Sequence, residues 1–355
     1  MRFQGSIYKA VQVFTLILAG LIVCGLLIIT SVCLAAGDEW TKKADMPTER
    51  GWLSGSMMLG RLYAIGGWVG VPFIGQPLQT VEEYDPVRNK WSKKADMPTA
   101  RANLSCSLVD GKIYAIGGWI GGAGWETLLS ATEEYDPVAD TWTKKADMPT
   151  ARGMLSTSVV AGKIYAIGGY DGQRISTIEE YDPVTDTWLK KADMPTARGW
   201  MGTSVVNNRI YAIGGYDDLK DIPLKVVEEY DPATDTWTKR TDMPTARLGL
   251  TTDIVNGKIY AIGGTESYGN FKSSLSKVEI YDPVLDKWEV GLDMPTARAW
   301  LSSGTNDGKI YAIGGVTTDF DNLAVVEEYK PEGWPFAVSS QDKLATTWGK
   351  IKRGR

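Results

Sequence analysis

The chain has 355 residues, of which 43% are hydrophobic and 23% charged, and its formal net charge is −5. This composition is typical of a globular protein with ample material for a core. Histidine is absent, which excludes catalytic triads built on imidazole and removes the commonest zinc and copper ligand. Cys24 and Cys33 lie in an N-terminal apolar segment, so Cys106 has no disulfide partner in the rest of the chain. We expect neither a metal nor another cofactor.

An uncharged apolar stretch, residues 11–37, follows Arg2 and Lys9. Its length is close to the roughly 20 residues of a membrane-spanning helix, but the small residues near Ala36 suit cleavage. Residues 1–36 are therefore predicted to be a signal peptide or an N-terminal membrane anchor. We favour cleavage because the first predicted strand follows within a few residues. Both alternatives predict that the remaining chain is exported, to the periplasm, the cell surface or the medium.

One sequence unit recurs six times after this segment. Paired glycines fall at 66/67, 117/118, 168/169, 214/215, 263/264 and 314/315, so successive spacings are 51, 51, 46, 49 and 51 residues. Each unit contains an alternating run, a tight turn such as DGK, the run IYAIGG, a third run such as TIEEYDP and a fourth such as TWLKKADMP. The alternation and the turns predict four short antiparallel strands per unit. Such units are typical of β-propeller blades.

The sixth unit lacks its fourth run, because VEEYKP is followed by EGWPFAV. The missing run appears before the first complete unit as EWTKKADMP, residues 39–47. The N-terminal strand is therefore predicted to complete the last blade and leave no open edge in the ring. Residues 332–355 form a C-terminal tail outside the repeats. Docking through Trp334 and Trp348, a surface-sorting signal and disorder are the alternatives for this tail.

The repeat resembles the kelch motif. Besides the paired glycines, the resemblance is carried by a tyrosine in the third run and a tryptophan in the fourth. The tyrosines are Tyr84, Tyr135, Tyr181, Tyr230, Tyr281 and Tyr329, and the tryptophans are Trp91, Trp142, Trp188, Trp237 and Trp288, with Trp40 as the sixth. The resemblance implies an all-β, six-bladed kelch β-propeller over residues 38–331, closed by the N-terminal strand. We expect an exported, bacterial-type, monomeric propeller.

All length variation lies in the loop between the second and third strands. The residues between each glycine pair and the next glutamate number 14, 14, 9, 12, 14 and 11. In an up-and-down blade this loop shares a face with the four-to-one connection that carries MPTAR. We call this the variable-loop face, and the opposite one the constant face. Loops that vary in length on a rigid scaffold usually contain the residues that bind ligands.

The variable-loop face supplies the candidate ligand-binding residues. In kelch proteins that bind peptides, residues just after the paired glycines and at the start of the innermost strand line the central pocket, so the resemblance implicates the same positions. Tyrosine and tryptophan suit peptide anchors or sugar rings, and packing of some rings between blades is the alternative. The candidates are Trp52, Trp68, Asn103, Trp119, Trp125, Met154, Tyr170, Arg174, Trp200, Tyr216, Tyr268 and Trp300.

Other sets recur identically in the blades, and we interpret them as structural. One arginine and one glutamate per unit are predicted to pair and tie the third strand to the four-to-one loop; an anion funnel of arginines is the alternative. The second glutamate of the third run, replaced by Ile280 in the fifth unit, is expected to be solvated. The fourth-run tryptophan is expected to fill the wedge between blades. The arginines are Arg50, Arg101, Arg152, Arg198, Arg247 and Arg298, and the glutamates are Glu82, Glu133, Glu179, Glu228, Glu279 and Glu327.

The leading functional hypothesis is a non-catalytic module that binds a protein segment or a glycan on the variable-loop face. The propeller carries a net charge of about −10, so no nucleic-acid partner is expected. Contact with a membrane is expected only through residues 1–36, if these are not cleaved.

The alternative hypothesis is enzymatic. Some exported kelch propellers are sugar mutarotases or isomerases, and the resemblance therefore allows a metal-free site made of a carboxylate and an arginine. A buried carboxylate with a raised pKa beside Arg174 would favour this activity. The candidates in the variable loops are Glu126, Arg174, Asp217, Asp218, Asp221 and Glu266.

Overall fold

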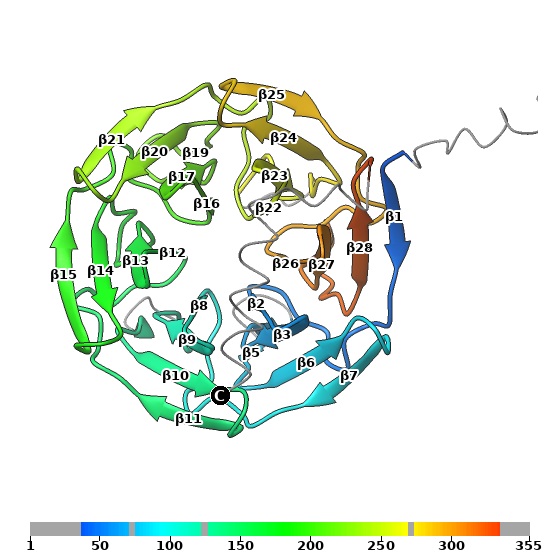
Figure 1. Ribbon diagram of the computed structural model, residues 1–355, viewed down its shortest axis with the longest axis horizontal. Helices are drawn as coiled ribbons and strands as arrows, with labels where there is room; N and C mark the ends of the chain where they lie inside the picture. The colour runs from blue at the N-terminus through cyan, green and yellow to red at the C-terminus, as the bar shows by residue number, and fades with distance from the viewer. Residues whose placement is uncertain (1–36, 71–74, 122–126, 269–272, 334–355) are drawn as a thin grey trace, which may run out of the picture.

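The computed structural model describes residues 37–70, 75–121, 127–268 and 273–333, which form six four-stranded antiparallel sheets arranged in a ring (Figure 1). The innermost strands line a central channel. The prediction of an all-β, six-bladed propeller is confirmed. No helix within these ranges is long and apolar enough to cross a membrane. Residues 1–36, the tail beyond Gly333, Trp125 and Glu126 lie outside the described residues, so the assignments made for them stay predictions.

Each blade is numbered from its innermost strand outwards. Blade one is β2 (Ser54–Met58), β3 (Arg61–Ile65), β6 (Val81–Asp85) and β7 (Lys90–Lys93), with a small hairpin β4 (Trp68–Val69) and β5 (Gln76–Pro77). Blade two is β8 (Ser105–Val109), β9 (Lys112–Ile116), β10 (Thr132–Asp136) and β11 (Thr141–Lys144). Blade three is β12 (Ser156–Val160), β13 (Lys163–Ile167), β14 (Ile178–Asp182) and β15 (Thr187–Lys191).

The remaining blades follow the same order. Blade four is β16 (Gly202–Val206), β17 (Arg209–Ile213), β20 (Val227–Asp231) and β21 (Thr236–Lys239), with a hairpin β18 (Tyr216–Asp217) and β19 (Ile222–Pro223). Blade five is β22 (Thr251–Val255), β23 (Lys258–Ile262), β24 (Val278–Asp282) and β25 (Lys287–Val290). Blade six is β26 (Ser302–Asn306), β27 (Lys309–Ile313), β28 (Val326–Lys330) and β1 (Glu39–Lys42).

The N-terminal strand closes the ring as the sequence predicts. In Figure 1 the blue β1 lies beside the red-orange β28, and Trp40 pairs with Tyr329 in their antiparallel register. The two rings lie 4.9 Å apart. Tyr329 donates its hydroxyl to Asp38, whereas each of the other five tyrosines donates to an Asp or Asn in its own turn between the third and fourth strands. Asp38 therefore provides the hydrogen-bond acceptor that the turn between the third and fourth strands provides in the other blades.

The core lies between neighbouring blades. In blade three Tyr165 and Ile167 of β13 pack against Ile210 and Ala212 of β17 in blade four. The second strand of each blade is a continuous apolar run because both of its faces are covered by adjacent sheets. Burying one such side chain contributes about 1.5–3 kcal/mol. The repeated KIYAI sequence of the second strand thus packs each blade against the next.

A buried ion pair fixes the base of each variable loop. In blade five Arg247 Nη2 lies 2.9 Å from Glu279 Oε2, and the arginine is 0% exposed. Arg247 Nη1 also donates to the carbonyls of Gly263 and Lys277 at the two ends of the loop. Thr245 donates its hydroxyl to the other oxygen of Glu279 at 2.7 Å. The six pairs are Arg50–Glu82, Arg101–Glu133, Arg152–Glu179, Arg198–Glu228, Arg247–Glu279 and Arg298–Glu327.

The paired glycines let the next blade reach this junction. Gly168 and Gly169 have φ of 56° and 110°, a region that side chains rarely adopt. A Cβ on Gly168 would lie 2.4 Å from the carbonyl oxygen of Arg198. Gly169 donates its N–H to that same carbonyl at 3.0 Å. The side chain of Arg198 pairs with Glu228 in its own blade, whereas its backbone carbonyl accepts the hydrogen bond from Gly169 in the preceding blade.

The fourth-strand tryptophans are less buried than the sequence suggests. Each is half-buried at the outer rim, because the fourth strand is the outer edge of its blade. The ring of Trp188 lies 5.0 Å from that of Tyr181. Its Nε1 donates to the carbonyl of Ala146 in the preceding blade at 2.9 Å. The tryptophan therefore packs, half-buried, against the outer end of the core between two blades and joins them there by a hydrogen bond.

The expectation that the second glutamate of the third strand is solvated is wrong. In blade one Glu83 accepts a hydrogen bond from the Tyr63 hydroxyl at 2.7 Å and lies 3.1 Å from Lys94 Nζ. The tyrosine of the second strand and the cation at the end of the fourth enclose the carboxylate on the same sheet face. The pairs are Glu83–Lys94, Glu134–Lys145, Glu180–Lys191, Glu229–Arg240 and Glu328–Lys43.

Blade five replaces both partners of this pair together. Ile280 stands in place of the glutamate and Gly291 in place of the cation. A Cβ on Gly291 would lie 3.1 Å from Ile280 Cδ1 and 2.8 Å from Val278 Cγ1. The apolar side chain thus occupies space that the lysine stem needs in other blades, and the two replacements compensate each other.

We predict that Arg247→Met lowers the free energy of unfolding by about 3–5 kcal/mol, because the buried Glu279 carboxylate loses its countercharge. Lys239→Met is the matched control. Lys239 lies 3.5 Å from Asp242 at the exposed rim, and an exposed pair contributes less than about 1 kcal/mol. Urea unfolding followed by tryptophan fluorescence measures both variants. Equal losses in the two variants would refute the role given to the buried pair.

Candidate functional site

A closed circle of backbone hydrogen bonds narrows the channel at the variable-loop face. Six residues, one before each innermost strand, each donate an N–H to the carbonyl of the equivalent residue in the preceding blade, at 2.7–3.0 Å. All six have φ between 49° and 64°. This conformation costs a side chain about 1–2 kcal/mol, and glycine much less. The six are Trp52, Asn103, Met154, Trp200, Gly249 and Trp300.

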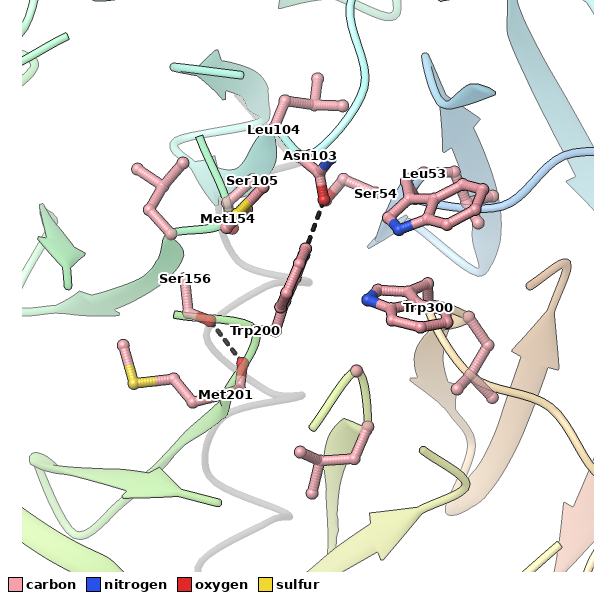
Figure 2. Close-up of a pocket in the computed structure, with 15 residues that line it drawn as sticks. Leu53, Ser54, Asn103, Leu104, Ser105, Met154, Ser156, Trp200, Met201 and Trp300 are labelled. Atoms are coloured by element: carbon pink, nitrogen blue, oxygen red, sulfur yellow. Dashed lines mark hydrogen bonds between the residues drawn. The ribbon is translucent and has the colours of Figure 1, made fainter. Parts of the chain in front are cut away.

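Side chains of this circle fill the mouth of the channel. Figure 2 shows Trp200 lying between Asn103 and Trp300, and Trp200 Nε1 donates to Asn103 Oδ1 at 2.9 Å. The rings of Trp200 and Trp300 lie 5.9 Å apart, and those of Trp52 and Trp300 lie 5.2 Å apart. Met154 and Trp300 are buried. A small cavity of about 120 Å³ lies among these residues.

The channel beyond this mouth has a volume of about 450 Å³ and is lined by the innermost strands. Its lining contains many serines and threonines and one charged side chain, Asp253. The other blades hold serine or glycine at this place: Ser56, Ser107, Ser158, Ser204 and Gly304. Asp253 accepts a hydrogen bond from Thr305 at 2.8 Å. Burial raises the pKa of Asp253 to about 6, from the ordinary 3.8, although hydroxyl hydrogen bonds oppose the shift.

Arg174 stands at the centre of a second grouping on the variable-loop face. Its side chain is buried, and its guanidinium carbon lies 4.2 Å from the ring centre of Trp200, 4.9 Å from Tyr170 and 5.5 Å from Tyr216. Arg174 Nε lies 3.1 Å from Asp218 Oδ1. Burial lowers the pKa of Arg174, and the charge of Asp218 opposes this. Three aromatic faces and one carboxylate thus hold the cation in place.

Tyr268 covers this grouping from the solvent side. Its ring lies 4.9 Å from Tyr216 and 5.2 Å from Trp200, and the residue is 39% exposed. We use the name aromatic cluster for Tyr170, Trp200, Tyr216 and Tyr268 around Arg174. Its members come from blades three, four and five, so the tertiary fold joins residues that lie in separate loops.

The remaining predicted residues pack near blades one and two. Trp68 and Trp119 are buried and stack at 5.0 Å with an interplanar angle of 14°. They pack with Ala102, and Trp52 and Leu128 lie against them. The candidates thus divide into three groups: the channel mouth, this stacked pair and the aromatic cluster. Trp125 lies outside the described residues.

Among the acidic residues of the variable loops that the structure describes, none forms with Arg174 the buried pair that the mutarotase hypothesis requires. Asp218 pairs with Arg174, but its side chain stays 33% exposed. Asp217 is buried, and burial opposes ionisation, yet hydrogen bonds from Lys220 and nearby backbone N–H groups lower its pKa. Asp221 and Glu266 are exposed. Among the described residues, no group of three or more His, Cys, Asp or Glu is placed to hold a metal ion.

The sequence comparison of loops missed Asp253, because Asp253 lies in an innermost strand rather than in a loop. Aligning the six innermost strands supplies the signal, since a carboxylate stands where most blades have serine. Burial disfavours its charged form. The propeller therefore carries one unfavourable charge inside its channel at neutral pH.

We predict that Asp253→Ser stabilises the propeller at pH 7.5 by roughly 2–3 kcal/mol and has little effect at pH 4. The folded-state pKa of Asp253 lies above the unfolded-state value, so folding favours the protonated acid and stability falls as pH rises from about 4 to about 6. Thermal unfolding across this range measures the difference. Asp110→Asn, an exposed turn position where other blades have Asn207 and Asn256, should leave the pH profile unchanged. If the stability of Asp253→Ser changed with pH in parallel with that of the unsubstituted chain, the raised pKa assigned to Asp253 would be wrong.

Comparisons with known proteins match the repeats directly. A family model described as the KLHDC2/KLHL20/DRC7 Kelch-repeats domain matches residues 38–215, and one described as the Kelch motif matches residues 201–244 and 246–295. The human Kelch repeat and BTB domain-containing protein 12 is 30% identical over 152 residues, which are 38% of this chain and 24% of that protein. The zebrafish Kelch-like ECH-associated protein 1B is 34% identical over 111 residues, 31% of this chain and 18% of that protein.

The chain thus spans about a quarter or less of these relatives. Among solved structures, that of YjhT superposes with a TM-score of 0.67 over 79% of this chain and 95% of the other, at 17% identity. This likeness supports the fold alone. The first family model covers half of the chain, and the ring of six blades agrees with it. The chain therefore belongs to the kelch-repeat family of β-propellers.

Proposed function

We propose that this propeller is a recognition module that binds a segment of another protein on the variable-loop face, centred on the aromatic cluster. The observation that carries the proposal is the convergence of Tyr170, Trp200, Tyr216 and Tyr268 from three blades. Rigid aromatic rings with polar edges are the side chains that most often anchor partners. If residues 1–36 direct export, as the sequence predicts, the partner lies outside the cytoplasm.

The hydrogen bonds that hold the two ends of the variable loops support this proposal. In blades one, three, five and six the variable loop begins and ends on carbonyls that the buried arginine binds, as at Gly168 and Thr177 with Arg152. The loop tips can therefore differ without disturbing the blades. Among the relatives, the zebrafish protein is described by its name as ECH-associated. An association with another protein is what we propose for this chain too.

Glycan binding remains an outcome of the test rather than our conclusion. Sugar rings stack on exposed aromatic faces, but within the aromatic cluster Tyr268 alone among the described rings is exposed, and the other rings pack on Arg174 and on one another. A sugar mutarotase is not proposed, because Asp218, which pairs with Arg174, is part-exposed, while the buried Asp217 pairs with Lys220.

We predict that the full chain binds members of a peptide array and that Tyr268→Ala weakens this binding about tenfold or more, because an anchoring ring is lost. Leu59→Ala is the control. Leu59 is an exposed apolar residue in the turn between β2 and β3 on the constant face, and its loss should leave binding unchanged.

The same variants are screened on a glycan array. Glycan binding without peptide binding would replace our conclusion with the carbohydrate alternative. Peptide binding that survives Tyr268→Ala but is lost in Leu59→Ala would show that recognition uses the constant face. Absence of binding on both arrays would overturn the proposal.

A further inference from the structure

The variable loops carry an excess of acidic residues. Among the described residues of the six loops between second and third strands, seven are acidic and four are basic. Arg174 is buried, Lys220 lies 3.0 Å from Asp217, and Lys277 donates to Thr245. The acidic residues are Asp171, Asp217, Asp218, Asp221, Glu266, Asp319 and Asp321, and the basic ones are Arg174, Lys220, Lys225 and Lys277.

Several of these carboxylates surround the aromatic cluster. One carboxylate oxygen of Asp218 accepts a hydrogen bond from Arg174 Nε, and a third of the Asp218 side chain stays exposed. Asp221 accepts the hydroxyl of Tyr216 and is itself exposed. Burial raises the pKa of Tyr268 and of Tyr170, and the negative charges of Asp218 and Asp221 add to the effect on Tyr268 and that of Asp171 to the effect on Tyr170. Within the described part of the chain, Asp171, Asp221 and Glu266 lie in no ion pair.

Arg174 cannot serve an acidic partner. Its side chain is 4% exposed, its Nε is engaged by Asp218, and its plane lies over three rings. An acidic segment placed on Tyr268 would meet the exposed carboxylate of Asp221, which lies in no ion pair among the described residues, and the part of Asp218 that stays exposed. Like charges repel by several kcal/mol at close range. A wholly apolar segment would remove those carboxylates from water without replacing their solvation. Both partner types are therefore disfavoured.

A cation is favoured by the same two features. The exposed face of Tyr268 can accept a lysine or arginine side chain through a cation–π contact. Asp221 accepts the hydroxyl of Tyr216, whose ring lies 4.9 Å from that of Tyr268, and Asp218 pairs with Arg174 in the same cluster. Both carboxylates are therefore placed to pair with the charged end of that side chain. Arg174 already shows that this kind of environment holds a guanidinium.

We propose that the segment bound at the aromatic cluster is basic, with a lysine or arginine lying on Tyr268 and paired with Asp218 and Asp221. This inference rests on the proposed function, because it specifies the partner of the same surface. It concerns the chemistry of the anchor and not the identity of the partner protein.

The test uses an array of short synthetic peptides of varied sequence, each made in matched versions with Lys, Gln or Glu at its centre, and the full chain as probe. We expect lysine versions to bind about tenfold more tightly than glutamine versions, and glutamate versions to bind most weakly. The preference should weaken as salt rises, because exposed charges are screened.

Two variants locate the preference. Asp218→Asn combined with Asp221→Asn should abolish the preference for lysine; Asn tolerates the positive φ of 53° at Asp221. Asp221→Asn alone should remove part of it, which keeps the test valid if Asp218→Asn loosens Arg174. The matched control is Asp110→Asn with Asp307→Asn. It makes the same change of charge in turns of the constant face, where other blades have Asn207 and Asn256.

The outcomes separate the two proposals. Equal or tighter binding of glutamate versions, or a lysine preference that survives the Asp218 and Asp221 variants, overturns the basic partner. If such binding is still lost in Tyr268→Ala, the proposed recognition function stands without it. Failure of every peptide version to bind overturns both.

Discussion

The buried arginine–glutamate pair is the contact on which the rest of this propeller depends. Removing two charges from water is costly, and such a pair persists only where further hydrogen bonds satisfy its atoms. Here the neighbouring threonine and the loop carbonyls supply those bonds, as Thr245, Gly263 and Lys277 do for Arg247 and Glu279. Because the arginine binds both ends of its loop in blades one, three, five and six, loop length can change there while the blade stays fixed. The constant framework and the variable loops are therefore two results of one interaction.

The centre of the ring shows how repetition and asymmetry coexist. Six residues must adopt a positive φ to close the circle of backbone hydrogen bonds, yet only the fifth blade uses glycine there. The other blades keep large or polar side chains despite the strain, and Trp52, Trp200 and Trp300 close the mouth of the channel together. Strained backbone of this kind persists when surrounding contacts determine it strongly. The circle supplies those contacts, and the side chains make each blade different.

Departures from the repeat are informative because the other blades serve as internal controls. Ile280 and Gly291 replace an ion pair together, so their difference is explained by packing within one blade. Asp253 accepts a hydrogen bond from Thr305, but burial still makes its charge unfavourable in the channel. Arg174 is compensated by rings and by Asp218 from other positions in the ring of blades. The aromatic cluster therefore belongs to the assembled propeller rather than to any single repeat.

The repeats are sufficient to predict the blade count, the four strands per blade, the closure through Trp40 and the pairing of each arginine with a glutamate. These follow from periodicity, because a motif repeated in every blade reports a contact that every blade needs. Which candidate rings are exposed depends on the tertiary structure. Trp68, Trp119 and Tyr216 are buried and Tyr268 is exposed, although all four lie in variable loops after a glycine pair. Tertiary structure also enclosed the second glutamates and placed Arg174 against Tyr170, Trp200 and Tyr216. These outcomes depend on distances between loops of different blades, and one-dimensional spacing contains no such distances.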